Sequence, residues 1–259
     1  MRIEILGPLR LVDVCDITYI TAPKAETLCA VLLARANQTV STAELVHEIW
    51  GADAPRRATA TLHVHISQLR KLLVRPDGCN PIVTEPGGYR LDTAADLLDV
   101  DSFHAQADAG RTHVQAGRLT AALDSLEGAL RLWRGPAFGR VADSQIVTSY
   151  ATYLDEERLD CLELLFEVSL MLGRHRQVVG RLYTLTSAHP LRESFYRLLM
   201  LALYRSERQS AALAVYRAAR ERLNSEIGLE PGRPLRELHQ AILVGDDRID
   251  AQDDLSPAV

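Results

Sequence analysis

Residues Arg56–Arg75 have the sequence RRATATLHVHISQLRKLLVR. The stretch carries five basic residues and no acidic one, in a chain of 259 residues whose formal net charge is -5. A helix turns by about 100° per residue, which gathers the large apolar side chains of this stretch on one side: Leu62, Ile66, Leu69 and Leu73. The opposite side is small, polar or cationic, with Arg57, Ala60, Val64, Ser67, Gln68 and Lys71. The pattern predicts an amphipathic helix with a basic outer face.

Two interpretations fit such a helix. An apolar stripe that anchors the helix, opposite cationic and hydrogen-bonding side chains, suits insertion into the major groove of DNA. The alternative is an ordinary surface helix whose basic face is solvated. The segments on both sides of the helix favour the first interpretation.

The segment before the basic helix predicts a helix over 42–50. Ser41 is suited to cap its first turn, and Glu44, three residues later, completes a possible capping box. Gly51 ends this helix. A short turn then leads into the basic helix, so the two form a helix-turn-helix pair.

The segment after the basic helix predicts a hairpin. Residues 81–85 and 88–91 have the character of strands on either side of Pro86-Gly87. The beginning of the chain predicts two short strands and one further helix, at residues 2–6, 10–14 and 23–36. This order of elements is that of a winged helix-turn-helix domain, in which the hairpin is the wing.

The stretch LHVHISQLRKLL, followed by GYRL, resembles the third helix and wing of the DNA-binding domain of OmpR/PhoB-type response regulators. Ile49-Trp50-Gly51 matches the entry to that family's turn, and the resemblance covers about residues 1–91. In that family a phosphoacceptor receiver domain is expected before this segment. Since the sequence starts at the first strand, phosphorelay control is not expected.

The second half of the sequence is almost wholly helical in pattern. Gly117-Arg118, Gly173-Arg174 and Glu207-Arg208 each precede a helical segment, and the last two pairs are 34 residues apart, which is the tetratricopeptide period. A longer helical insertion over 145–172 separates the first two units. Small residues are predicted to let paired helices pack closely, namely Ala122, Gly180 and Ala214. The alternative is a generic helical bundle.

Residues His189–Leu243, which include GLEPGRPLRELH, resemble the bacterial transcriptional activator domain of the Streptomyces antibiotic regulatory proteins. The two resemblances follow each other in the order that this family uses. The sequence therefore predicts a mainly α fold with a small β component, in which an N-terminal winged helix-turn-helix precedes an all-α tetratricopeptide-like domain. The predicted limits are 1–92 for the DNA-binding domain, 99–245 for the activator domain and 246–259 for an acidic, disordered tail.

The outward side of the basic helix supplies the candidate base contacts, which are His63, Val64, Ser67 and Gln68. Val64 suits a thymine methyl group, and Gln68 suits adenine or another base edge. The candidate contacts to the DNA backbone are Trp50, Arg56, Arg57, Thr61, Arg70, Lys71, Arg75, Thr84 and Arg90. Two positions depart from the OmpR/PhoB pattern. Ser67-Gln68 stands where arginines are common, and Glu85-Pro86 stands where relatives often carry a minor-groove arginine.

Other chemistry finds little support in the sequence. His63 and His65 project about 200° apart on a helix and cannot share one metal ion, and the four cysteines form no CxxC pair. No Walker loop, GxSxG, HExxH or GxGxxG is present. We therefore expect a protein that is not an enzyme, with no catalytic residue, cofactor or metal.

The distribution of charge agrees with a DNA partner. Residues 1–95 hold ten Lys/Arg and ten Asp/Glu, so the acidic excess lies entirely in the remainder, and it is the local field that steers binding. No apolar run approaches the length of a membrane span, and no signal peptide is evident. We expect a cytoplasmic, nucleoid-associated protein without a membrane partner.

The family resemblance implies a transcriptional activator of antibiotic or other secondary-metabolite gene clusters. It implies binding to direct repeats near promoters by a homodimer or tandem protomers. It also implies recruitment of RNA polymerase holoenzyme through the sigma, alpha or beta subunits. The alternatives are a repressor with the same fold, or a tetratricopeptide-like scaffold or ligand sensor.

Overall fold

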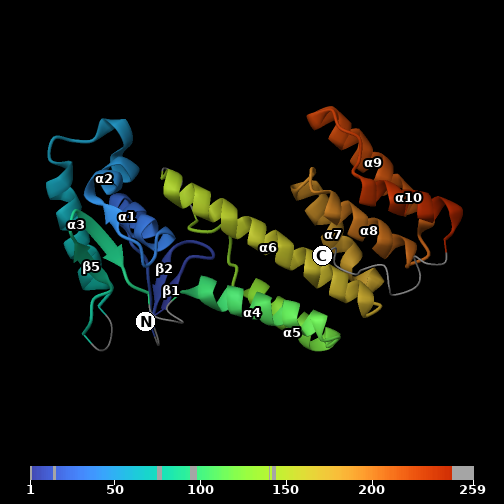
Figure 1. Cartoon of the computed structure of the whole chain (residues 1–259), viewed down its shortest axis with the longest axis horizontal. Helices are drawn as coiled ribbons and strands as arrows, with labels where there is room; N and C mark the ends of the chain where they lie inside the picture. Colours follow the sequence, from blue (N-terminus) through green and yellow to red (C-terminus); the bar gives the residue numbers. More distant parts are fainter. Residues whose placement is uncertain are drawn as a thin grey trace. The chain divides into compact units, whose positions relative to one another are not determined.

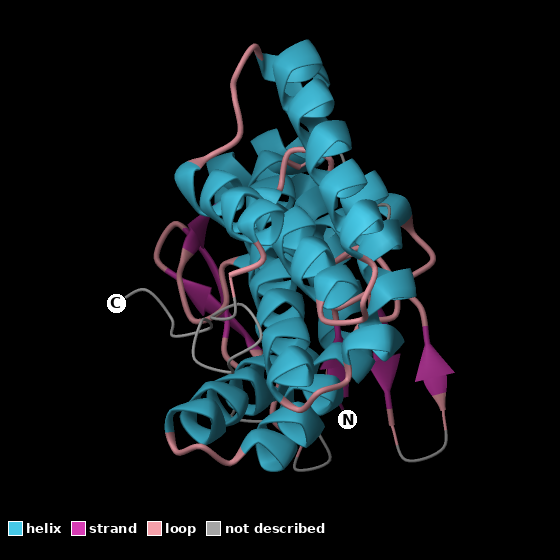
Figure 2. Cartoon of the chain, turned by 90° about the vertical axis from the view of Figure 1, so that its right-hand side faces the viewer, coloured by secondary structure: helices cyan, strands magenta, loops and turns pink. Residues whose placement is uncertain are grey.

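A computed structural model describes residues 2–13, 16–74, 78–93, 98–139, 141 and 144–246. Helices form most of this chain and its strands are short (Figure 1, Figure 2). The chain divides into two compact units, of which unit 1 comprises Met1–Asp108 and Gly128–Leu159, and unit 2 comprises Ala109–Glu127 and Asp160–Val259. The predicted mainly α fold with a small β component is confirmed. The predicted acidic tail at 246–259 lies outside the described residues, apart from Asp246.

Unit 1 contains two small antiparallel sheets. The first has the order β1-β2-β3, and the second has the order β4-β6-β5, in which β5 and β6 form the predicted hairpin. The sequence did not predict β4, because a strand of two residues is too short to show alternation. The strands are β1 (Arg2–Glu4), β2 (Arg10–Val12), β3 (Ile17–Thr18), β4 (Val40–Ser41), β5 (Ile82–Glu85) and β6 (Gly88–Leu91).

Three helices of unit 1 pack against one another: α1 (Pro23–Ala34), α2 (Thr42–Trp50) and α3 (Ala58–Leu72). The Ser41 hydroxyl accepts a hydrogen bond from the Glu44 N–H at 3.1 Å, which caps the first turn of α2 as predicted. Gly51 ends α2 with φ 60°, a conformation that favours glycine, and a short 3-10 turn, η1 (Gly51–Asp53), follows. These helices and the β5–β6 hairpin confirm the predicted winged helix-turn-helix.

Three helices belong partly to unit 1 and partly to unit 2: α4 (Asp99–Gln115), α5 (Leu119–Arg131) and α6 (Gln145–Met171). The limits of the compact units fall inside all three, so the units do not coincide with a division between residues 92 and 99. The domain limits from the sequence remain a prediction.

A buried carboxylate joins the start of α4 to the first sheet. Asp99 is 2% exposed and accepts hydrogen bonds from the N–H groups of Ile5 and Leu6, at 2.8 and 3.1 Å. The Arg134 guanidinium lies 3.6 Å from the same carboxylate. Burial raises the pKa of Asp99, although the two N–H groups and the Arg134 charge act in the opposite direction.

A second carboxylate joins the helix-turn-helix to α6. Glu48, on α2, accepts hydrogen bonds through Oε2 from the Ser144 hydroxyl at 2.6 Å and from the Ile146 N–H at 3.2 Å. The side chains of Glu48 and Ser144 are both buried. A carboxylate at this place satisfies the Ile146 N–H, which lies in the first turn of α6 and has no carbonyl partner within that helix, and it interacts favourably with the helix dipole.

Unit 2 contains α7 (His175–Ala188), α8 (Glu193–Tyr204), α9 (Gln209–Ile227) and α10 (Arg233–Val244). Helix α8 packs against the other three, which makes it the centre of the group. Of the small residues predicted at helix contacts, Ala122 is buried but Gly180 and Ala214 are exposed. That prediction is wrong for the last two, because they lie on the outer sides of α7 and α9.

The three paired positions of the internal repeat share one backbone conformation. Gly117, Gly173 and Glu207 have φ 68°, 75° and 63°. The N–H of the following arginine donates in each case to a carbonyl five residues earlier, at His113, Ser169 and Leu203. This arrangement is a left-handed helix ending, and it explains why two of the three positions are glycine.

Glu207 carries the strain of that conformation, since a side chain at positive φ costs about 1–2 kcal/mol. We expect Glu207→Gly to raise the free energy of unfolding by about 1 kcal/mol, measured by thermal or urea denaturation. Gly117→Ala is the matched opposite change, because an added Cβ there meets nothing within 4 Å. It should lower stability by a similar amount, and equal stability of all three proteins would contradict the explanation.

Candidate nucleic-acid interface

Helix α3 is held in unit 1 by its apolar side. Leu62, Ile66, Leu69 and Leu73 are each at most 2% exposed, which confirms the predicted stripe. The helix follows a turn in which the Ala58 N–H donates to the Pro55 carbonyl at 2.8 Å. The buried stripe therefore fixes which side of α3 faces away from the core.

The four candidate base contacts all lie on that outer side. His63, Val64, Ser67 and Gln68 are exposed, and Val64 exposes 54% of its surface although it is aliphatic. A half-exposed valine in the middle of this helix is suited to apolar contact with a base methyl group. Their role in reading bases remains a prediction.

Gln68 is oriented by its neighbour. Its Oε1 lies 3.2 Å from Nδ1 of His65, whose ring stacks on Trp50 with 6.4 Å between ring centroids. His65 is half-buried, in contrast to the exposed His63. The contact engages the carbonyl of the Gln68 amide and leaves its NH₂ group directed elsewhere.

Arg70 joins α3 to the wing. Its guanidinium donates to the Ile82 carbonyl at 3.1 and 3.2 Å and to the Thr84 hydroxyl at 2.7 Å. It also lies 6.0 Å from the ring centre of Tyr89. Asn80 completes the joint, because its amide donates to the Arg70 carbonyl at 2.5 Å and accepts from the Ile82 N–H at 3.0 Å.

These contacts change what is expected of Arg70. Arg70 was predicted to contact phosphate, but its guanidinium donors are engaged by Ile82 and Thr84 within the protein. Its first role is therefore to position the wing on α3. The sequence missed this joint because Arg70 and its partners in β5 are 12 to 14 residues apart. It also gave no role to Asn80 and Tyr89.

The other residues predicted to contact the DNA backbone differ in how far their side chains are exposed to solvent. Arg56, Arg57, Lys71 and Thr84 are exposed, whereas Trp50 and Thr61 are half-buried. The Thr61 hydroxyl donates to the Arg57 carbonyl at 3.1 Å. Arg75 lies outside the described residues. The exposed cations leave Arg56, Arg57 and Lys71 as the strongest candidates for phosphate contacts.

The wing carries its own ion pairs. The Arg90 guanidinium lies 2.6 Å from Asp92 and 3.3 Å from Glu85, and hydrogen bonding to Asp92 raises the pKa of Arg90 above its ordinary value. The wing is anchored to α2, because the Gly87 carbonyl accepts hydrogen bonds from the Thr42 N–H and hydroxyl at 2.9 and 3.1 Å. Arg90 is therefore engaged within the wing.

The described residues were also searched for a metal site and for a membrane-spanning helix. Among them, no three His, Cys, Asp or Glu side chains come together as a set of metal ligands. The described helices include none that is both long and apolar enough to cross a bilayer.

Comparison with known proteins gives two family matches. Residues 19–91 match "Transcriptional regulatory protein, C terminal", and residues 98–243 match "Bacterial transcriptional activator domain". The transcriptional regulator RedD of Streptomyces coelicolor is 37% identical over 250 residues, which cover 95% of this chain and 71% of RedD. The regulatory protein AfsR of Streptomyces griseus is 37% identical over 256 residues, which cover 96% of this chain but 25% of AfsR.

A solved structure also matches almost the whole chain. It is that of Mycobacterium tuberculosis EmbR in complex with a low-affinity phosphopeptide, with a TM-score of 0.90 and 33% sequence identity. The match covers 97% of this chain and 67% of the EmbR chain. Since a winged helix and an activator domain follow each other here as in these relatives, the chain belongs to the Streptomyces antibiotic regulatory protein family of transcriptional regulators.

Proposed function

We propose that this protein activates transcription by binding direct repeats near promoters through tandem protomers and recruiting RNA polymerase. A secondary-metabolite gene cluster is the proposed target, since the relatives include RedD and AfsR. One winged domain contacts only a short half-site, so two protomers are needed for useful specificity. The helical region would make the contacts between protomers and with the polymerase.

The observation that carries the proposal is the outer side of α3. It presents Val64, Ser67 and Gln68 between exposed cations, on a helix fixed by four buried side chains. Cations that neutralise phosphates position a protein on DNA, whereas the central side chains distinguish bases.

The contact between Gln68 and His65 leaves Gln68 able to pair with a base. An amide carbonyl has two lone pairs and the NH₂ group has two donors. The single contact with His65 therefore leaves one lone pair and both donors for adenine or another base edge.

Footprinting and in vitro transcription on the upstream regions of neighbouring genes test the function. Protection of two adjacent repeats upstream of the promoter, with a higher transcript yield, is the expected result. Protection across the promoter with reduced transcript would identify a repressor. Absence of any salt-sensitive specific complex would favour a scaffold or ligand sensor.

Two substitutions separate base contacts from phosphate contacts. Gln68→Ala should cost about 1–3 kcal/mol at the preferred site and relax the choice of base at one position. Lys71→Ala should weaken binding to all sequences alike and reduce the salt slope by about one. Fluorescence anisotropy on a set of single-base operator variants measures both effects. An equal loss on every operator variant for Gln68→Ala would contradict its role.

A further inference from the structure

The candidate base contacts of α3 differ in how much freedom their side chains have. Val64 and Ser67 rotate about a single side-chain bond, so the helix backbone already fixes most of their position. His63 is longer, and its ring lies edge-on to that of Tyr89 in the wing, with 6.3 Å between ring centroids. Gln68 is the longest and most flexible of the four. An amide that is already held in place recognises a base edge at a lower entropic cost.

Gln68 is held by His65, which precedes it by three residues on α3. Residues at this spacing are neighbours on the surface of a helix, and Nδ1 of His65 lies 3.2 Å from Oε1 of Gln68. An amide oxygen only accepts hydrogen bonds, so the arrangement places a proton of the His65 ring on Nδ1. The NH₂ group of the Gln68 amide takes no part in this contact.

His65 is itself fixed by a second helix. Its ring stacks on that of Trp50, the last residue of α2, with 6.4 Å between ring centroids and 28° between ring planes. His65 and Trp50 are both half-buried, whereas Gln68 is exposed. A chain of contacts therefore runs from the packed pair of helices to the outer side of α3.

We propose that His65 is a positioning residue for base recognition, because it is stacked on Trp50 and holds the Gln68 amide in the orientation that meets one base edge. This inference rests on the proposed function, in which Gln68 contacts a base. A flexible side chain loses conformational entropy when DNA orders it, and the contact with His65 removes part of that loss in advance. His65 thereby sharpens the choice of base at one operator position without touching the DNA itself.

Two substitutions of matched shape test the role of His65. Asparagine keeps an N–H donor at the place of Nδ1, on the atom bonded to Cγ, whereas leucine has a similar outline and no donor. We expect His65→Leu to reduce the preference for the favoured base at the Gln68 position about fivefold, and His65→Asn to retain most of it. Fluorescence anisotropy on single-base operator variants gives the preference as a ratio of dissociation constants. Circular dichroism melting verifies that both variants are folded.

A double-mutant cycle separates positioning from a purely structural role. In the Gln68→Ala background, His65→Leu should change no base preference, because the side chain that His65 positions is absent. An equal loss of affinity on every operator variant, or a further change of preference in the Gln68→Ala background, would overturn the proposal.

The cycle also distinguishes this inference from the function on which it rests. If Gln68→Ala relaxes the choice of base at one position while His65→Leu does not, the base contact stands and the role of His65 is refuted. If neither substitution affects the choice of base, both are refuted.

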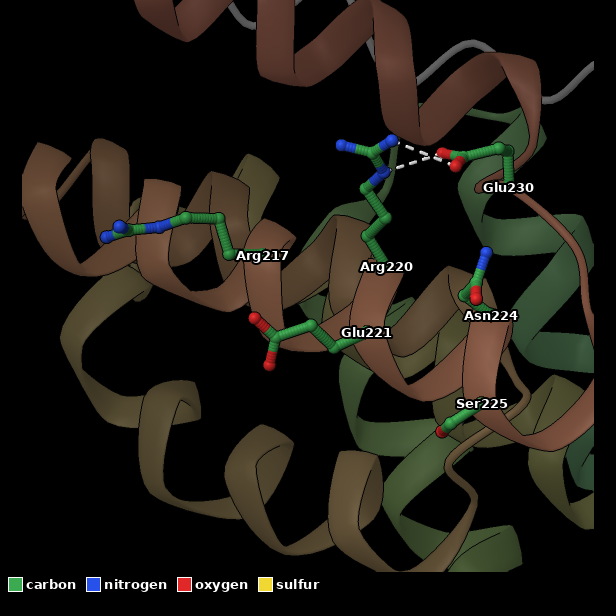
Figure 3. A pocket seen from close by; sticks show the side chains of 6 residues that line it. All are labelled: Arg217, Arg220, Glu221, Asn224, Ser225 and Glu230. Carbon is green, nitrogen blue, oxygen red and sulfur yellow. Dashed lines mark hydrogen bonds and ion pairs between the residues drawn. The ribbon is translucent and has the colours of Figure 1, made fainter.

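An ion pair of unit 2 supplies the remote control. Figure 3 shows the Arg220 guanidinium directed at Glu230 in a pocket that both residues line, and hydrogen bonds of 2.7 and 2.9 Å join the two groups. Both residues are exposed, so Glu230→Gln removes a side-chain contact at little cost to stability. This variant should keep the base preference of the unchanged protein. A change as large as that of His65→Leu would show that the effect is not specific to His65 and Gln68, which contradicts the proposal.

Discussion

Replacement of Val64 by aspartate is expected to lower the affinity for a specific DNA site at least 100-fold while the protein remains folded. Val64 exposes 54% of its surface in the middle of α3, so its replacement removes little packing. In the proposed complex the new carboxylate would face the acceptor-rich floor of the major groove and the phosphates. Like charges brought together at an interface cost several kcal/mol, and a 100-fold loss corresponds to about 2.7 kcal/mol.

Ile17→Asp is the matched control for this substitution. Ile17 lies on β3, in the first sheet of unit 1 and not in the wing or on α3, and exposes 53% of its surface, so the same change of an aliphatic side chain to a carboxylate occurs at equal exposure. Anisotropy with one half-site at fixed salt, together with circular dichroism melting, measures binding and folding separately. If both variants bind DNA equally well, the outer side of α3 is not the DNA-contacting surface.

The features that the sequence predicted well are those with a short repeat along the chain. Burial recurs every three or four residues in α3, so Leu62, Ile66 and Leu69 mark the inner side without knowledge of the fold. The starts of the repeat helices were also predicted, since a Gly-Arg or Glu-Arg pair precedes each of α5, α7 and α9. The structure adds that the first residue of each pair has a left-handed conformation. A local pattern is sufficient there because the interaction itself is local.

Contacts between residues distant in the sequence were not predicted. Glu48 caps α6 through Ser144, which is 96 residues away, and nothing in the sequence of α2 distinguishes this glutamate from one exposed to solvent. Arg70 was assigned to phosphate because its charge is visible in the sequence while its partners in the wing are not. Gly180 was expected at a helix contact, but small size alone does not determine the side of a helix on which a residue lies.

Asp99 is the contact of this kind whose loss should matter most for stability. It holds two backbone N–H groups and faces Arg134, all within unit 1. In Asp99→Asn one side-chain oxygen becomes an NH₂ group, which leaves one buried N–H unsatisfied, whereas Arg134 keeps its ion pair with Glu4 at 3.2 Å. An unsatisfied buried donor costs about 1–3 kcal/mol. We expect a loss of about 2 kcal/mol, or roughly 4–8 °C in melting temperature.

Asp101→Asn is the control, because Asp101 lies in the same first turn of α4 but is exposed. Because Asp101 is exposed, solvent screens its interactions, and its replacement should lower stability by no more than about 1 kcal/mol. The pH dependence gives a second readout that loss of packing alone would not produce. Burial raises the folded-state pKa of Asp99, so the folded protein holds the proton of this side chain more tightly than the unfolded chain does. The resulting contribution to stability is fully present below the unfolded-state pKa and is lost as the pH rises through the folded-state pKa. That slope should be missing in Asp99→Asn and present in Asp101→Asn. Equal melting temperatures and equal slopes for the two variants would show that the first residue of α4 does not hold the winged helix in place.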